Sequence, residues 1–323
     1  MGVVIHATIA IGNHCHFRLG SRLVFWFSDP FSTDFMVRAL LGGALVAAIC
    51  GVVGTWVVIR GMAFLGEAIG HGMLPGVALA TVLGLPVLVG GAISAGAMSA
   101  AIGALQRRGR LSYDTTIGLL FVAMLSSGII IVSHSRSFAT DATTILFGDI
   151  LAIRTAELLT LACALTVTLG IAIAFHRSFV ASAFDPRIAH TLGLRPRLAQ
   201  VMLVTLVTLA VVASYQAVGS LLVVALLLGP VVAARRWTGR IPSTMLLATM
   251  FGFAAVTSGL LVSWHAGTAA GASIAFCAIF LALVSAITRH THSRFRHRHN
   301  SDPAGETVHL KDESPVSIGT ETR

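Results

Sequence analysis

Residues 60–76 read RGMAFLGEAIGHGMLPG and place two ionisable side chains, Glu67 and His71, inside an otherwise apolar region. A spacing of four residues puts both on one helical face, one turn apart. A charged group inside a membrane span costs roughly a few kcal/mol, so such groups mark functional sites by default. We therefore expect this pair to line the path of a metal ion. The alternative is a structural pair, with Glu67 hydrogen-bonded to a neighbouring helix.

The rest of the chain is strongly apolar. Of its 323 residues, 55% are hydrophobic and 11% are charged, with a mean hydropathy of +0.86, whereas soluble domains carry roughly 25% charged residues. The apolar residues form long uninterrupted runs, which predicts an all-α, polytopic membrane protein. The net charge of +9 does not indicate nucleic-acid binding, because the arginines cluster in short loops and in the C-terminal tail, without a basic face or an aromatic platform.

Nine apolar segments are expected to cross the membrane. They lie at about residues 35–59, 63–84, 86–105, 115–133, 157–175, 198–214, 218–234, 243–264 and 268–287. If the sixth and seventh form one broken re-entrant unit, the count drops to eight or fewer. Residues 134–155 also hold a short apolar piece, ILFGDILAI, which cannot cross a bilayer and is a partial helix, a re-entrant helix or an extension of the fifth span.

Single residues predict how several spans begin, bend and pack. Pro75 predicts a kink just beyond His71, and Gly229-Pro230 predicts a break in the seventh span. Asp114 is expected to cap the start of the fourth span. Two stripes of small residues predict close helix packing, one in the first span at Gly43, Ala47 and Gly51, and one in the third at Gly91, Ala95, Ser99 and Gly103.

Basic loops follow the first, third, fifth, seventh and ninth spans. Positive charge accumulates in cytoplasmic loops, so this pattern predicts an external N-terminus, a cytoplasmic C-terminus and a location in the inner membrane of a prokaryote. Arg18, Arg22 and Arg38 lie on the opposite side in this scheme. No removable signal peptide is apparent, and the four cysteines lack the paired spacing of a disulfide framework.

The chain divides into an interfacial N-terminal segment, residues 1–34, a transmembrane domain, residues 35–287, and a polar tail, residues 288–323. The N-terminal segment contains His14-Cys15-His16, which either binds metal or belongs to a flexible terminus. Four histidines of the tail either collect metal or belong to a solvated tail that helps to anchor the protein: His290, His292, His297 and His299.

The longest internal polar loop, residues 176–197, holds a short helix with marked ends. Asp185 can cap its start, Pro186 suits its first turn and Gly193 suits its left-handed exit. Apolar residues that recur every four positions give this helix one apolar face: Phe184, Ile188 and Leu192. Such a helix either docks a partner protein or lies at the lipid headgroups.

Several segments in a fixed order resemble the permease subunits of ABC importers for zinc, manganese and iron. The first is FMVRALLGGALVAAICGVVGTWVVIRGMAFLGEAIGHGMLPGVALA, at residues 35–80. The later ones are LSYDTTIGLLF, ILFGDILAI, FDPRIAHTLGLRPR and QAVGSLLVVALLLGPVVAAR. Because several motifs recur in sequence, the resemblance is specific, and it covers about residues 31–287.

The resemblance implies the architecture of an ABC importer permease, with about eight to nine transmembrane helices. Its implied partners are two cytoplasmic ATP-binding subunits, an extracytoplasmic metal-binding protein and a second permease, which is either a copy of this chain or a relative. It assigns metal binding to Glu67 and His71 and makes residues 177–197 the coupling segment that seats on the ATPase. Aspartate is familiar at the position of Glu67 and a small hydroxyl residue at that of Gly70, so the pore geometry can differ here.

Two copies of the Glu67–His71 face, meeting at a two-fold axis, would present two carboxylates and two imidazoles. Four such ligands suit tetrahedral zinc, and manganese or ferrous iron are also feasible. The histidines at both termini favour zinc. The binding forms are neutral imidazole and ionised carboxylate, so affinity should fall in acid. We expect no bound cofactor, since the metal is the transported substrate.

Catalysis by this chain is not expected. A P-loop ends in Gly-Lys-Ser/Thr, but the only lysine, Lys311, follows Leu310. An HExxH motif is absent because Gly66 precedes Glu67. ATP hydrolysis is therefore expected from a separate subunit. The alternative function is a secondary metal carrier driven by an ion gradient. Such carriers usually need intramembrane acids for the coupling ion, however, and Glu67 is the only clear acid in the middle of a span.

Overall fold

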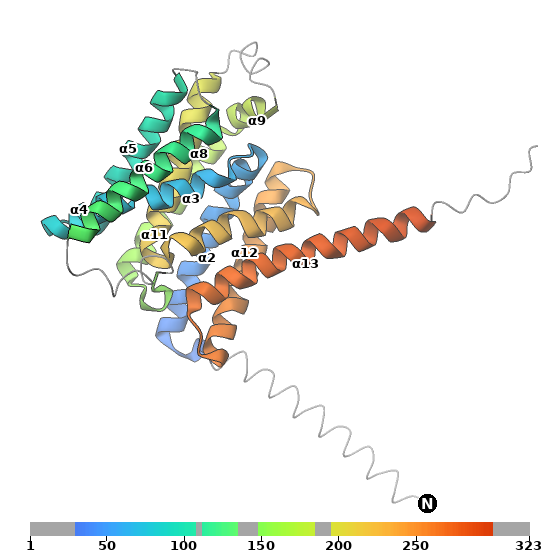
Figure 1. Ribbon diagram of the computed structural model, residues 1–323. Coiled ribbons are helices and arrows are strands. Elements are labelled where there is room, and N and C mark those ends of the chain that lie inside the picture. The colour runs from blue at the N-terminus through green and yellow to red at the C-terminus, as the bar shows by residue number, and fades with distance from the viewer. Residues whose placement is uncertain (1–29, 108–111, 135–147, 185–194, 300–323) are drawn as a thin grey trace, which may run out of the picture.

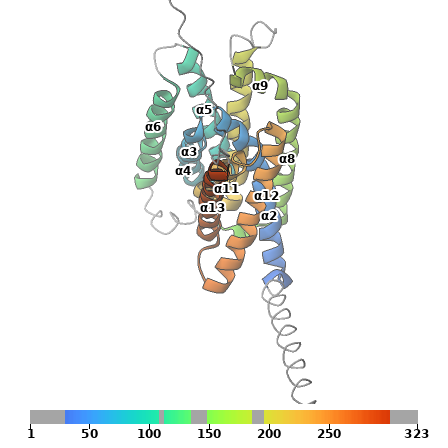
Figure 2. The same cartoon turned by 90° about the vertical axis from the view of Figure 1, so that its right-hand side faces the viewer.

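The computed structural model describes residues 30–107, 112–134, 148–184 and 195–299, and every regular element in these ranges is a helix (Figure 1 and Figure 2). Nine helical segments of this part are long and apolar enough to cross a membrane. The long helices are α2 (Asp34–Ile59), α3 (Ala63–Gly72), α4 (Leu74–Leu83), α5 (Val87–Arg107), α6 (Tyr113–His134), α8 (Thr155–Ala174), α11 (Pro196–Arg235), α12 (Ile241–Ala266) and α13 (Ala270–His299). The short ones are η1 (Pro30–Ser32), η2 (Ile150–Ala152) and α9 (His176–Phe184).

Helix α2 packs in the core of the bundle against α11, α12 and α8. Its predicted small-residue stripe lies against α12, because a Cβ atom on Gly43 would lie 2.5 Å from Cγ1 of Val256, and one on Gly51 would lie 2.5 Å from Oγ1 of Thr249. The glycines therefore let the two helices approach closely, and the expectation of tight packing is confirmed for this stripe.

The stripe on α5 packs tightly over only part of its length. A Cβ atom on Gly91 would lie 2.6 Å from Cε of Met73, and the hydroxyls of Ser99 and Thr208 lie 2.6 Å apart. Gly103, however, has nothing within 4 Å of a Cβ position. The expectation is therefore wrong at Gly103, which lines a cavity between α5 and α11.

The helix ends gather in two groups. Nη1 of Arg60 donates to Oε1 of Gln200 at 2.7 Å, and the ring centroids of Trp56 and His176 lie 5.5 Å apart, so the end of α2 lies beside the beginnings of α9 and α11. Away from these, the rings of Phe35 and Trp264 are 6.1 Å apart. We call the first group the basic end, because it includes Arg60, Arg107, Arg197, Arg235 and Arg240, and the second the opposite end.

Helix α11 is a hairpin with its turn at Gly219, where φ is 72° and ψ is 167°. Gln200 in the first arm bonds Arg60, and Nη1 of Arg235 at the end of the second arm lies 3.5 Å from the carbonyl oxygen of Val58. Both ends of α11 therefore lie at the basic end. The two arms contain the candidate spans Pro196–Tyr215, of 20 residues, and Ala217–Arg235, of 19 residues including the turn, and both are long and apolar enough to cross a membrane. This supports separate sixth and seventh spans.

The predicted break at Gly229-Pro230 is wrong. Pro230 lies inside the helix, and Gly219 is the residue of α11 with non-helical dihedral angles. Gly229 packs against α13, since a Cβ atom there would lie 3.0 Å from the carbonyl oxygen of Ala278. Support from a neighbouring helix is one way in which a membrane helix tolerates a proline.

The second span breaks just beyond His71, as predicted. Helix α3 ends at Gly72 and α4 begins at Leu74, with Met73 between them. Pro75 lies in the first turn of α4, where its missing N–H is tolerated. The break therefore precedes the proline.

The cap of the fourth span was assigned to the wrong residue. Oγ of Ser112, and not the carboxylate of Asp114, accepts the backbone N–H of Thr115 at 3.2 Å. Asp114 lies in the first turn of α6, where its charge still favours the positive end of the helix dipole.

The short apolar piece that precedes α8 is not a continuation of that helix. Its described part contains the 3-10 helix η2. Gly148 lies so close to the turn of α11 that a Cβ atom there would overlap the backbone of Val218 and Gly219. Ile153 packs against Gly42 of α2, with Cδ1 2.5 Å from a Cβ position there. This piece therefore lies between α2 and the turn of α11.

Two further differences lie near the chain's polar segments. Helix α9 forms within the predicted polar loop and packs through Phe179, whose ring lies 5.2 Å from that of Trp56.

Helix α13 continues beyond residue 287 to His299 and extends away from the bundle in Figure 1. The run His14-Cys15-His16 lies outside the described residues, as do Arg18 and Arg22.

Candidate functional site

Helix α3 brings the two predicted metal ligands together. Nε2 of His71 and Oε1 of Glu67 lie 2.8 Å apart, one turn along the helix. The His71 side chain is 17% exposed and that of Glu67 is 26% exposed. The carboxylate is thus partnered by the imidazole of its own helix, whereas a hydrogen bond from Glu67 to a neighbouring helix does not appear among the described contacts.

The other face of α3 is apolar and packs against both arms of α11. Leu65, Ala68 and Ile69 are fully buried. A Cβ atom on Gly66 would lie 2.7 Å from Cδ2 of Leu227, and one on Gly70 would lie 3.4 Å from Cβ of Ser220. The packing face and the face with the ionisable pair are therefore separate.

Phe121 of α6 contacts the imidazole of His71. Its ring lies edge-on to that of His71, with the centroids 5.5 Å apart, and also to that of Phe64 at 5.4 Å. The sequence analysis did not name Phe121 as part of the site. Its only signal in the sequence was an aromatic residue inside the fourth span.

Glu67 and His71 are two potential metal donors in the described part of the chain. Within the described ranges, no group of three or more His, Cys, Asp and Glu side chains is placed to hold a metal ion. Glu67 and His71 offer two donors, whereas a tetrahedral site needs four. The additional pair from a second permease remains a prediction.

The other predicted site residues are placed only in part. Phe184 is the last residue of α9, while the remaining residues of the expected coupling helix lie outside the described residues: Asp185, Pro186, Ile188, Leu192 and Gly193. His290, His292, His297 and His299 lie on the last turns of α13, so this part of the tail is helical; their side chains are outside the described part.

Arg60 and Gln200 form a contact that the sequence analysis missed. The Arg60 side chain, at the end of α2, donates to Gln200 in the second turn of α11. Its Nε and Nη2 atoms are buried without a hydrogen-bond partner in the described structure, and burial lowers the pKa of its guanidinium. The contact links the start of α11, which follows the expected coupling segment, to the turn that leads into α3.

Comparison with known proteins identifies the family of this chain and supports its fold. The family model of the ABC 3 transport family matches residues 32–289. The chain belongs to this family. The match includes the helix that carries Glu67 and His71 and all of the described membrane-crossing segments, while α13 continues beyond it to His299.

Several relatives of this ABC 3 family member are named as membrane proteins of metal transport systems. The manganese transport system membrane protein MntC of Halalkalibacterium halodurans is 38% identical over 259 residues, which is 80% of this chain and 88% of that protein. The chelated iron transport system membrane protein YfeD of Yersinia pestis is 31% identical over 265 residues, 81% of this chain and 88% of that protein.

A solved structure agrees with the fold. The structure described as PsaBC from Streptococcus pneumoniae in complex with Fab matches with a TM-score of 0.72 and 30% identity, covering 81% of this chain and 95% of that one. The ABC 3 chain is therefore a multi-pass membrane protein and a permease of an ABC importer for divalent metals.

Proposed function

We propose that the open face of α3 binds the metal ion during its passage through the permease. The observation that carries this proposal is the contact of 2.8 Å between Nε2 of His71 and Oε1 of Glu67. Imidazole and carboxylate are the donors that divalent transition metals accept. The apolar back of α3 holds the helix in place, so the pair is free to exchange its mutual hydrogen bond for bonds to an ion.

The transported ion is manganese or ferrous iron in this proposal. The expectation of zinc came from a four-ligand set that suits tetrahedral zinc and from the histidines of the two termini. The relatives cited above are named for manganese and iron, and the carboxylate of Glu67 suits these harder ions. Zinc remains the competitor that a transport assay must include.

The energy comes from a separate ATP-binding subunit, and the chain works with a second permease and an extracytoplasmic metal-binding protein. Two donors per chain favour this pairing, because a second copy doubles the number of protein ligands at the ion. A secondary carrier driven by an ion gradient is the alternative. Uptake that survives ATP depletion and collapses with the proton gradient would favour that carrier.

The test is metal uptake by cells that lack the native protein and express a variant. The Glu67→Gln/His71→Ala double variant should import manganese and iron at less than about a tenth of the wild-type rate, because both donors are lost. Glu67→Asp keeps a carboxylate and should retain uptake. Co-purification of the ATP-binding subunit shows whether each variant assembles. A double variant that assembles and imports metal at the wild-type rate would disprove the proposal.

A further inference from the structure

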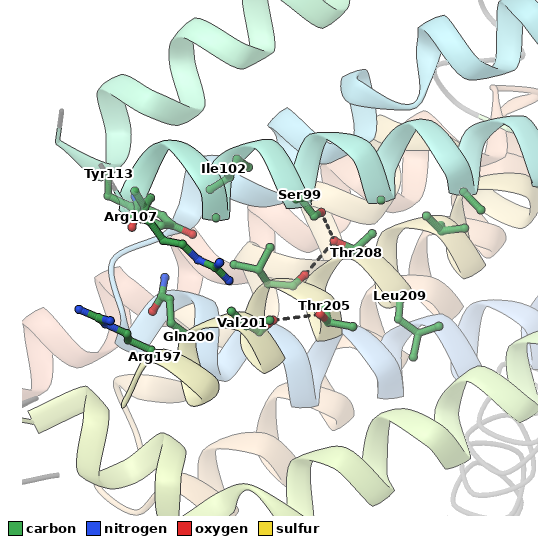
Figure 3. Close-up of a pocket in the computed structure, with 17 residues that line it drawn as sticks. Ser99, Ile102, Arg107, Tyr113, Arg197, Gln200, Val201, Thr205, Thr208 and Leu209 are labelled. Carbon is green, nitrogen blue, oxygen red and sulfur yellow. Dashed lines mark hydrogen bonds between the residues drawn. The ribbon is translucent and has the colours of Figure 1, made fainter. Parts of the chain in front are cut away.

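A cavity of about 960 Å³ lies between α5 and the first arm of α11, closed at one end by the start of α6. Glu67 and His71 do not line it, so it is separate from the proposed metal site. Figure 3 shows Arg107, Tyr113, Arg197 and Gln200 gathered at one end of the cavity, with Ser99, Thr208 and Leu209 farther along.

The wall of the cavity changes from basic to apolar along its length. At the basic end of the bundle it carries the exposed Arg107 and Arg197, neither of which has a salt bridge among the described residues. Further in, the hydroxyls of Ser99 and Thr208 bond each other at 2.6 Å, and Thr208 also bonds the carbonyl of Val204 at 2.8 Å, so they satisfy their hydrogen bonds within the wall. The inner part is therefore effectively apolar.

The cavity opens on the outside of the bundle. Gly96, Ala100, Val201 and Thr205 line it and are exposed. Small residues on α5 make this room, since a Cβ atom on Gly96 or Gly103 would meet nothing within 4 Å. In a membrane protein such a surface faces lipid or another protein chain.

The length of the cavity suits an acyl chain. From Arg197 to Val212 the wall follows α11 over sixteen residues, which is roughly 22 Å of helix from the first Cα to the last. One leaflet contributes roughly half of the 30 Å hydrocarbon core. A headgroup beside the two arginines would therefore leave the inner part for one or two hydrocarbon tails.

We propose that this cavity binds an anionic phospholipid, with the phosphate between Arg107 and Arg197 and an acyl chain along Gly96 and Gly103. Basic pockets between membrane helices recognise anionic headgroups in this way. A second copy of the chain is a poorer occupant, because Asp114 is the one acid that the described residues offer at the basic end. A phospholipid carries its own phosphate to pair with the arginines.

The test measures lipid retained by the purified full-length protein, by native mass spectrometry, after titration with phosphatidylglycerol or with phosphatidylcholine of the same acyl chains. The wild type should retain phosphatidylglycerol preferentially. Arg107→Gln/Arg197→Gln should reduce that retention at least fivefold by removing the cations, and Gly96→Leu should reduce it similarly by filling the channel.

Two matched controls make the result specific. Arg236→Gln/Arg240→Gln removes two exposed charges from the same end of the bundle, and Gly170→Leu adds the same side chain on α8, where nothing lies within 4 Å of a Cβ position. Both should retain lipid like the wild type.

Three outcomes would overturn the proposal. The first is equal retention of the two lipids by the wild type. The second is loss in the arginine variant with full retention in Gly96→Leu, which would indicate attraction of any anion, and inorganic phosphate should then compete. The third is wild-type retention of phosphatidylglycerol by both cavity variants together with a lower fraction of dimer. That result would mean that a second copy of the chain occupies the cavity.

Discussion

The Arg60 guanidinium depends on one residue of a distant helix. It is partly buried, its Nη1 bonds Gln200 at 2.7 Å, and its Nε and Nη2 are buried without partners in the described structure. If a buried charged group loses its hydrogen-bond partner, its desolvation is no longer compensated and the folded state becomes less stable. Gln200 is therefore expected to matter for stability as well as for the geometry of the α2–α3 turn.

We expect Gln200→Leu to lower the free energy of unfolding by about 1–3 kcal/mol, because it leaves the charge of Arg60 without its acceptor. The Arg60→Met/Gln200→Leu double variant should recover part of this loss, since neither a charge nor an amide then remains at the contact. Thermal unfolding of the purified proteins in one detergent measures both. A double variant less stable than Gln200→Leu would contradict the argument.

The sequence predicts contacts within one helix better than contacts between helices. Glu67 and His71 are four residues apart, so helical geometry alone places them together. Arg60 and Gln200 are 140 residues apart, and Phe121 reaches His71 from another helix. No local pattern encodes these pairs, because they depend on how the helices pack.

At the scale of elements, the turn of α11 depends on one glycine. Gly219 has φ 72° and ψ 167°, a backbone conformation that is essentially restricted to glycine. Gly148 lies against this turn without room for a Cβ atom. The turn thus joins the two arms of α11 to the piece that precedes α8.

We expect Gly219→Ala to destabilise the protein by about 1–3 kcal/mol, because alanine must adopt the strained conformation or the turn must change. Gly118→Ala is the matched control on α6, where nothing lies within 4 Å of a Cβ position, and should be neutral or stabilising by up to about 1 kcal/mol. Thermal unfolding midpoints compare the two. Equal midpoints would mean that the turn does not need glycine.

The sequence predicts the positions of the membrane helices well, but it predicts the breaks within them poorly. The first span was expected at residues 35–59 and is Asp34–Ile59, and the eighth was expected at 243–264 and is Ile241–Ala266. Length and hydropathy suffice for these. The turn at Gly219 was not assigned to its residue and a break was wrongly placed at Gly229-Pro230, because composition does not reveal which glycine has a positive φ and which proline a neighbour supports.

At the scale of the whole molecule, the hairpin of α11 determines how the chain crosses the membrane. A straight helix of 40 residues would be about 60 Å long, roughly twice the hydrocarbon thickness. With the turn at Gly219, Arg195 and Trp237 lie on one side, whereas a straight helix would separate them. The orientation and the division into three parts remain predictions.

Cysteine labelling tests this topology in a background from which the four native cysteines have been removed. Arg195→Cys and Trp237→Cys should react with an impermeant maleimide only after cells are permeabilised, because both follow basic segments expected in the cytoplasm. Ala266→Cys, at the exposed end of α12, should react in intact cells. Labelling of positions 195 and 237 from different sides would exclude the hairpin.

Helix α3 anchors itself with one face and offers its ionisable pair on the other. Exchanging Glu67 or His71 for another donor disturbs neither Gly66 nor Gly70, where α3 meets α11. On the proposed metal site, selectivity for the transported ion could therefore change during evolution by one or two substitutions that leave the packing of α3 intact. An engineer seeking a transporter for a different ion could begin with a small library at positions 67 and 71.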